Sequence, residues 1–249
     1  MEYDCAMTDL PEPRPNLTAN DLEAHVQNVN AYGFTIIAGV LSESELAKAR
    51  SLLDRIYESY DPRIDGRQKV EGYRFSANLV NKGPFFEMLF LKEPVYSLAR
   101  RLLGQDCILS SANSLEPLQG QTNQGLHRDA GSPVAGRVMS MNSWWAIDPM
   151  DADNGATRLV PGSHGDDAPP KSMEGRAVQV KLSAGDVVAI NARIVHGASA
   201  NHSGRRRRVV HIYFVRHGEP QQTEQKRFLS PEVQARLSPL ARRTLGLEE

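Results

Sequence analysis

The chain has 249 residues, with 29 Lys and Arg against 30 Asp and Glu and a formal net charge of -1. This balance argues against nucleic acid as the main partner, and no apolar run approaches the roughly 18 residues that a membrane span needs. Two cysteines are too few for a disulfide framework, and no N-terminal secretion signal is evident, so we expect a cytoplasmic protein.

The N-terminal part of the chain carries helical patterns. Residues 1–17 hold prolines among polar neighbours, so we expect a flexible leader outside the fold. Helical spacing of apolar residues then predicts three helices, over residues 18–33, 43–58 and 94–104. Ser42 and Glu45 form a capping box at the start of the second helix, and residues 34–40 are rich in β-formers. Residues 60–90 lack a clear period, and we expect loops or an edge strand there.

From Cys107 onward, helical spacing gives way to short β-prone runs separated by turn residues. The expected strands cover residues 107–115, 137–147, 157–160, 177–182, 186–190, 193–197 and 207–215. After about residue 220 the chain becomes polar and helical again, since Ser230-Pro231 and Ser238-Pro239 are typical helix starts. We therefore expect one mainly β domain over residues 18–249, in which helices flank a double sheet and a polar helical tail follows.

The stretch from Gln124 to Asp129 suggests a metal site. His127 and Asp129 are two residues apart, so in an extended strand their side chains lie on the same face. His196, which we expect to end another apolar strand, is the candidate third ligand. Two histidines and one carboxylate form the facial triad of non-haem Fe(II) oxygenases, which leaves coordination positions open.

Further motifs surround these residues in a fixed order. They are Gly33-Phe34-Thr35-Ile36-Ile37, the run from Leu41 to Leu46, Leu102-Leu103-Gly104, the run from Asn154 to His164, and Gly185-Asp186-Val187-Val188. In this order they resemble the phytanoyl-CoA dioxygenase family of Fe(II)- and 2-oxoglutarate-dependent oxygenases, over roughly residues 20–218. The resemblance implies a double-stranded β-helix core of jelly-roll, cupin-like type, with N-terminal helices packed on one sheet. It also implies Fe(II), 2-oxoglutarate and O2 as cofactors, and His127, Asp129 and His196 as metal ligands.

The resemblance also indicates how the cosubstrate is held. The distal carboxylate of 2-oxoglutarate needs a fixed cation, and a planar guanidinium suits that role. Family members place this arginine eleven residues after the second histidine, which is Arg207 here; Arg205 has the same strand parity and is the alternative. The other arginines of the 205–208 run are expected in a solvated loop or strand edge. Gln124 and Thr157 resemble positions that hydrogen-bond the cosubstrate.

These features favour a dioxygenase that oxidises a C–H bond of a small organic molecule, such as a biosynthetic intermediate. Hydroxylation with release of succinate and CO2 is the default expectation, while desaturation, epoxidation, cyclisation and epimerisation stay open. Asp129 disfavours halogenation, because the related halogenases leave that position vacant for chloride.

Two other classes of protein fit part of the pattern. A zinc hydrolase could use the same three ligands with bound water as nucleophile, but Arg207 and Gln124 would then have no role. A β-sandwich binding module could hold a structural ion, but the open coordination face would then serve no purpose.

The walls of the substrate pocket are expected from irregular segments. Residues 72–86 and 130–138 are rich in turn residues and are predicted to form a lid. Neither segment carries a dense cluster of basic residues that would bind the phosphates of a CoA ester, so we expect a free small molecule. Trp144 and Trp145 are adjacent on one expected strand, so only one of them can face the interior.

Overall fold

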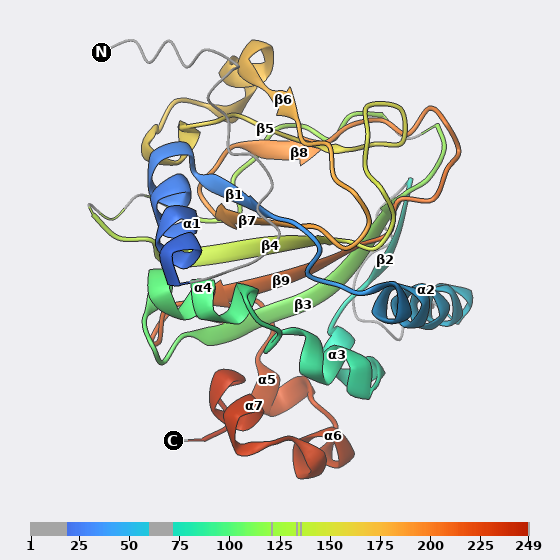
Figure 1. Ribbon diagram of the computed structural model, residues 1–249, viewed down its shortest axis with the longest axis vertical. Helices are drawn as coiled ribbons and strands as arrows, with labels where there is room; N and C mark the ends of the chain where they lie inside the picture. The colour runs from blue at the N-terminus through green and yellow to red at the C-terminus, as the bar shows by residue number, and fades with distance from the viewer. Residues whose placement is uncertain (1–18, 60–71, 121, 133, 135, 249) are drawn as a thin grey trace.

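The computed structural model describes residues 19–59, 72–120, 122–132, 134 and 136–248. Two antiparallel sheets face each other, and helices cover the outer side of the larger sheet (Figure 1). This arrangement confirms the predicted mainly β fold with N-terminal helices packed on one sheet. The predicted leader over residues 1–17 lies outside the described residues. Within the described part, no helix combines the length and the apolar character that crossing a membrane requires.

The larger sheet has six strands and the smaller sheet has three. In spatial order the larger sheet runs β1 (Phe34–Ile37), β7 (Val187–Asn191), β4 (Ser140–Ala146), β9 (Val209–Val215), β3 (Ile108–Pro117) and β2 (Tyr73–Ser76). The smaller sheet runs β6 (Val178–Gln179), β5 (Thr157–Leu159) and β8 (His196–Ala198). Most neighbouring strands are far apart in the sequence, as the crossovers of a jelly roll require.

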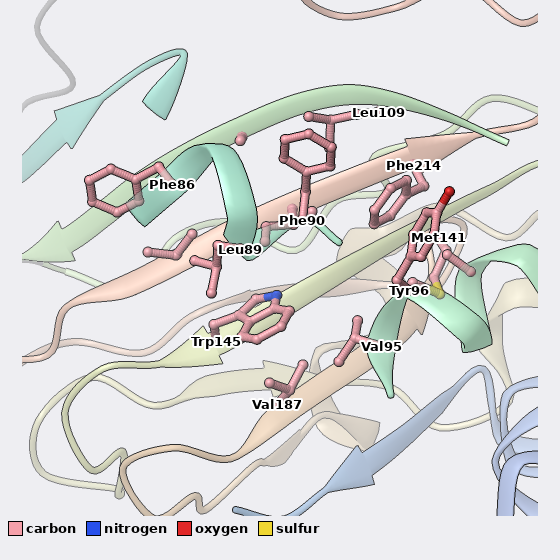
Figure 2. Packing of buried hydrophobic residues seen from close by; sticks show 14 of the residues in the cluster. Phe86, Leu89, Phe90, Val95, Tyr96, Leu109, Met141, Trp145, Val187 and Phe214 are labelled. Carbon is pink, nitrogen blue, oxygen red and sulfur yellow. The ribbon is translucent and has the colours of Figure 1, made fainter. Parts of the chain in front are cut away.

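Helices lie on the outer side of the larger sheet. They are α1 (Ala19–Tyr32), α2 (Glu43–Glu58), α3 (Pro84–Leu89), α4 (Val95–Leu103), α5 (Gln225–Phe228), α6 (Pro231–Arg236) and α7 (Pro239–Thr244). Apolar side chains from these helices and from the sheet share one buried cluster, in which the ring of Tyr96 lies 6.2 Å from the ring of Phe214 (Figure 2). The C-terminal helices contribute to the same cluster through Leu229, Val233, Leu237, Ala241 and Leu245.

Strand β4 shows how the strands divide their side chains between the two faces. Trp145 packs in the cluster under the helices, where its Nε1 donates to Ser143 Oγ at 3.0 Å. Trp144 packs in the second cluster, between the two sheets. Successive strand residues face opposite sides, so the expectation for this tryptophan pair is confirmed. The side chains on the inner faces of β3, β4 and β9 can therefore form one wall of a site between the two sheets.

The structure differs from the predictions in three segments. Residues 72–86 do not form an irregular lid, because they include β2, the 3-10 helix η2 (Leu79–Lys82) and the start of α3, and the side chains of Leu79, Val80 and Phe86 are buried. Helix α3 has six residues, which is too short to show an apolar period. The strand expected over 193–197 starts later, because β8 begins at His196. Before it the chain makes a turn, in which the N–H of Ile194 donates to the carbonyl of Asn191 at 2.9 Å. The strand expected over 177–182 shortens to β6.

The capping box predicted for α2 is present and supports a stability prediction. The N–H of Glu45 donates to Ser42 Oγ at 3.4 Å, and the N–H of Ser42 donates to Glu45 Oε2 at 2.9 Å. We expect Ser42→Ala to lower the free energy of unfolding by about 1 kcal/mol, because an orphan N–H of the first turn loses its acceptor. Urea unfolding measures this change. The control is Ser51→Ala on the exposed face of α2, which should be neutral or stabilising; an equal effect of both substitutions would contradict the prediction.

Candidate active site

His127, Asp129 and His196 lie together, as the sequence predicts. The Nε2 atoms of His127 and His196 lie 3.6 and 3.7 Å from Asp129 Oδ1, and the ligand atoms of all three residues fall within 4.8 Å of one another. The backbone explains this convergence. His127 and His196 form an antiparallel bridge with N–H to O distances of 2.9 and 3.0 Å, and the N–H of Asp129 donates to the carbonyl of Ala192 at 3.0 Å.

Both imidazoles are oriented for metal binding through Nε2. The Nδ1 atom of His127 lies 3.1 Å from the carbonyl oxygen of Gly125, and that of His196 lies 3.0 Å from the carbonyl oxygen of Ile194. A carbonyl oxygen only accepts, so each Nδ1 donates its proton and the lone pair remains on Nε2. Burial lowers the pKa of His196 and outweighs the opposite effect of Asp129. His196 is therefore neutral at physiological pH, as a metal ligand must be.

The carboxylate of Asp129 is held from one side. Its Oδ2 accepts a hydrogen bond from Nδ2 of Asn142 at 2.8 Å. Its Oδ1 is the oxygen that faces both Nε2 atoms. Sequence reasoning missed Asn142, although this residue precedes Trp144 by two positions and therefore shares its inward face.

A cavity of about 270 Å3 contains all three candidate ligands. Two rows of side chains across β3, β9 and β4 form its floor, with Asn113, His211 and Trp144 in one row and Ser111, Tyr213 and Asn142 in the next. Burial lowers the pKa of His211 to about 3, so this side chain is neutral as well. A larger cavity of about 520 Å3 lies beside Phe34 and Leu182, but it holds none of the three ligands.

Arg207 reaches the same cavity and is almost completely buried, with 1% of its surface exposed. Its Nε donates to the carbonyl of Gly155 at 2.8 Å, and its Nη2 donates to Thr157 Oγ1 at 3.4 Å. Its Nη1 is buried and has no hydrogen-bond partner among the described residues. Burial lowers the pKa of Arg207 to about 10, so the guanidinium stays charged at neutral pH. The site therefore contains a buried cation that has no counter-ion within hydrogen-bond distance among the described residues.

The other three arginines of the run point away from the cavity. Arg205 is exposed and binds both carboxylate oxygens of Asp151, at 2.9 and 2.8 Å, so it is not placed to substitute for Arg207. Arg206 pairs with Glu116, and Arg208 pairs with Asp148 at 2.7 Å. The expectation of a solvated run was thus wrong for Arg208, which is buried and joined to the body of the domain.

Gln124 and Thr157 both line the cavity, as does Gln222, which sequence reasoning missed. Oε1 of Gln124 accepts from the N–H of Ala198 at 3.1 Å, which leaves its side-chain amide nitrogen as a donor. Gln222 follows β9 and is fixed to β3 at an irregularity next to Ser111, whose Oγ donates to Gln222 Oε1 at 2.7 Å. No pattern in the polar segment after residue 220 points to this contact, because it depends on the pairing of β3 with β9.

A jelly-roll core in which two imidazoles and one carboxylate meet at a point has the architecture of the mononuclear non-haem Fe(II) oxygenases. Comparison with known proteins agrees with this class. The model of the phytanoyl-CoA dioxygenase (PhyH) family matches residues 29–209. The dioxygenase FUM3 of Gibberella moniliformis is 24% identical over 211 residues, which cover 76% of this chain and 70% of that protein.

Two solved structures have the same fold. HygX from Streptomyces hygroscopicus, with nickel and 2-oxoglutarate bound, gives a TM-score of 0.69 at 18% identity, over 83% of this chain and 90% of that chain. SnoN, a non-haem alpha-ketoglutarate-dependent epimerase from nogalamycin biosynthesis, gives a TM-score of 0.67 at 21% identity, over 80% and 84%. These similarities support the jelly-roll fold that the sequence implied.

Because the family model covers well over half of the chain, this chain belongs to the phytanoyl-CoA dioxygenase family. It is a non-haem dioxygenase that depends on Fe(II) and 2-oxoglutarate and uses O2. The resemblance inferred from the sequence is thereby confirmed.

Proposed function

We propose that this dioxygenase hydroxylates a C–H bond of a small organic molecule, and that a single domain over residues 18–249 carries the activity. The proposed metal ligands are His127, Asp129 and His196, and the proposed cosubstrate contacts are Arg207, Thr157 and Gln124. The three metal ligands offer Nε2, Nε2 and Oδ1 to one point. This donor set suits Fe(II) and leaves three of six octahedral positions for the cosubstrate and O2.

One observation carries the proposal: the buried guanidinium of Arg207, whose Nη1 has no partner among the described residues, lies in the cavity of the three ligands. A buried charge without a partner is costly, whereas a carboxylate placed against the guanidinium would offset that cost. The distal carboxylate of 2-oxoglutarate is such a group. The hydroxyl of Thr157, which accepts from Nη2 of Arg207, can donate its own proton to the same carboxylate.

When bound, Fe(II) and 2-oxoglutarate supply the oxidative chemistry, in which O2 and the keto acid yield succinate, CO2 and an oxidised substrate. The chain's own part is to bind and orient. His127 and His196 are held by backbone carbonyls, so their lone pairs stay directed at the metal. The buried face of Trp144, whose ring lies 4.9 Å from that of His196, helps to keep water away from the ligand.

The rest of the cavity supports an uncharged, oxygen-bearing substrate. Apart from the metal ligands, Arg207 is the one charged residue among the described residues of its lining, and it would be taken up by the cosubstrate. The remaining polar lining consists of amides, hydroxyls and a neutral imidazole, contributed by Ser111, Asn113, His211, Tyr213 and Gln222 among others. Such groups recognise hydroxyl and carbonyl oxygens. They offer no cationic site for the phosphates of a CoA ester.

Hydroxylation is proposed as the outcome, with desaturation, epoxidation, cyclisation and epimerisation as alternatives that begin from the same site. Product mass separates most of them, since hydroxylation and epoxidation add an oxygen atom, desaturation and oxidative cyclisation remove hydrogen, and epimerisation leaves the mass unchanged. The zinc hydrolase alternative gives no role to the buried guanidinium of Arg207.

Anaerobic addition of 2-oxoglutarate to the Fe(II) protein should produce a visible charge-transfer band, because a keto acid that chelates Fe(II) through two oxygens creates this transition. Spectrophotometric titration measures it. Exposure to O2 with candidate substrates should then release succinate above the level of the metal-free protein.

Succinate itself is the matched control ligand, since it has two carboxylates but no keto group and should give no band. A protein that binds zinc in preference and shows no band with Fe(II) and 2-oxoglutarate would contradict the proposal. The same holds if a broad panel of neutral, oxygen-bearing compounds elicits no succinate release.

A further inference from the structure

Asn142 touches the side chain of Asp129, one of the three candidate metal ligands. It lies on β4, is 5% exposed, and donates through Nδ2 to Asp129 Oδ2 at 2.8 Å. A carboxylate only accepts, so the amide nitrogen must be the atom that faces Asp129. The other end of the amide, Oδ1, is buried and has no hydrogen-bond partner among the described residues.

This arrangement is unfavourable for the stability of the fold. A buried carbonyl oxygen without a partner loses its hydrogen bonds to water and gains none in return. A leucine has the same branching and the same number of side-chain heavy atoms as an asparagine, and it carries no polar atom that burial would leave without a partner. Asp129 does not need Asn142 to fix its backbone, since its N–H already donates to the carbonyl of Ala192. The asparagine therefore acts on the side-chain carboxylate of Asp129.

We propose that Asn142 is a positioning residue that sets the orientation of the Asp129 carboxylate for metal binding. With Oδ2 engaged by Asn142, Oδ1 alone faces the Nε2 atoms of His127 and His196. Without this contact the carboxylate is free to rotate about its Cβ–Cγ bond, and its oxygens no longer have a fixed place beside the imidazoles. Orienting contacts of this kind strengthen metal sites by ordering the ligand in advance. The inference rests on the proposed function, because it requires a metal ion at these three residues.

The test compares Asn142→Leu with the parent protein in two measurements. The first is the affinity for Co(II), a stable substitute for Fe(II), determined by anaerobic titration of the metal-free protein. We expect the affinity of Asn142→Leu to be about 10- to 100-fold weaker. The second is the melting temperature of the metal-free protein, which should be equal to or higher than that of the parent because the orphaned oxygen is gone.

Ser143→Ala is the matched control on the neighbouring position of β4. Ser143 is fully buried, faces the helices, and donates to the carbonyl of Ile212 at 3.0 Å while accepting from Trp145. Its loss should lower the melting temperature and leave the Co(II) affinity unchanged. The two variants are thus expected to show opposite patterns, which a general loss of structure cannot produce.

The possible outcomes distinguish the proposed role of Asn142 from the proposed metal site itself. Parent-like Co(II) affinity in Asn142→Leu would overturn the role of Asn142 while leaving the metal site intact. Loss of folding in Asn142→Leu would also overturn it, since Asn142 would then serve the fold. A parent protein that binds no Co(II) would remove the metal site, and with it the proposed function.

Discussion

The double variant His127→Ala, His196→Ala is expected to take up no stoichiometric Fe(II), whereas the parent protein should bind one equivalent. Both substitutions remove an imidazole whose Nε2 faces Asp129 Oδ1, and they leave a single carboxylate oxygen at the site. One partly exposed carboxylate does not hold a divalent iron against water. Metal-stripped protein is reloaded without oxygen, passed through a desalting column and assayed for iron. The parent should retain one equivalent of iron and the double variant none.

The control for this experiment is the double variant His202→Ala, His217→Ala. Both side chains are exposed, and neither belongs to the cluster of candidate ligands. Its iron uptake should match that of the parent. Retained uptake by the His127→Ala, His196→Ala variant would mean that the metal binds elsewhere, and the assignment of the site would be withdrawn.

His127 and Asp129 could be predicted as a pair of candidate metal ligands from their spacing, and the family resemblance added His196 as the third. The alternation of an extended strand suggested that His127 and Asp129 share a face. The structure has no regular strand there, only an isolated bridge at His127 and a bend at Asp129, and backbone hydrogen bonds to His196 and Ala192 bring the two side chains together.

The alternation of an extended strand correctly separated Trp144 from Trp145. The position of Arg207, which came from the resemblance, lies in the cavity although its neighbours in the run do not.

The residues that were missed depend on contacts between distant parts of the chain. Asn142 can contact Asp129 because β4 passes beside that residue. Gln222 contacts Ser111 next to an irregularity in the pairing of β3 with β9. Neither relation leaves a periodic trace in the sequence.

The irregular lid expected over residues 72–86 was wrong for a related reason. Turn residues separate short regular elements there, and burial of Leu79 and Phe86 in the core stabilises these elements. Tyr73 and Phe75 of the same segment nevertheless line the cavity, as expected for a pocket wall.

Replacement of Arg207 is expected to weaken 2-oxoglutarate binding strongly while sparing iron. Truncating one partner of a buried, hydrogen-bonded charge pair costs about 2–5 kcal/mol, so Arg207→Ala should raise the Kd for 2-oxoglutarate by roughly 30- to several-thousand-fold. Arg207→Lys should lie between the alanine variant and the parent, because an ammonium keeps the charge but lacks the planar fork that matches a carboxylate. Titration of the Fe(II)-loaded variants through their charge-transfer band gives the Kd, and iron assays before titration confirm equal loading.

Arg205→Ala separates the role of Arg207 from a general effect of the arginine run. Arg205 is exposed and pairs with Asp151 at the surface, so its removal should leave the Kd for 2-oxoglutarate unchanged. Arg207 differs because its Nη1 is buried without a partner among the described residues, in the cavity that contains the three candidate metal ligands. If Arg205→Ala weakened 2-oxoglutarate binding and Arg207→Ala did not, Arg205 would be the arginine that binds the cosubstrate. In that case the buried guanidinium of Arg207 would need another anion to account for it.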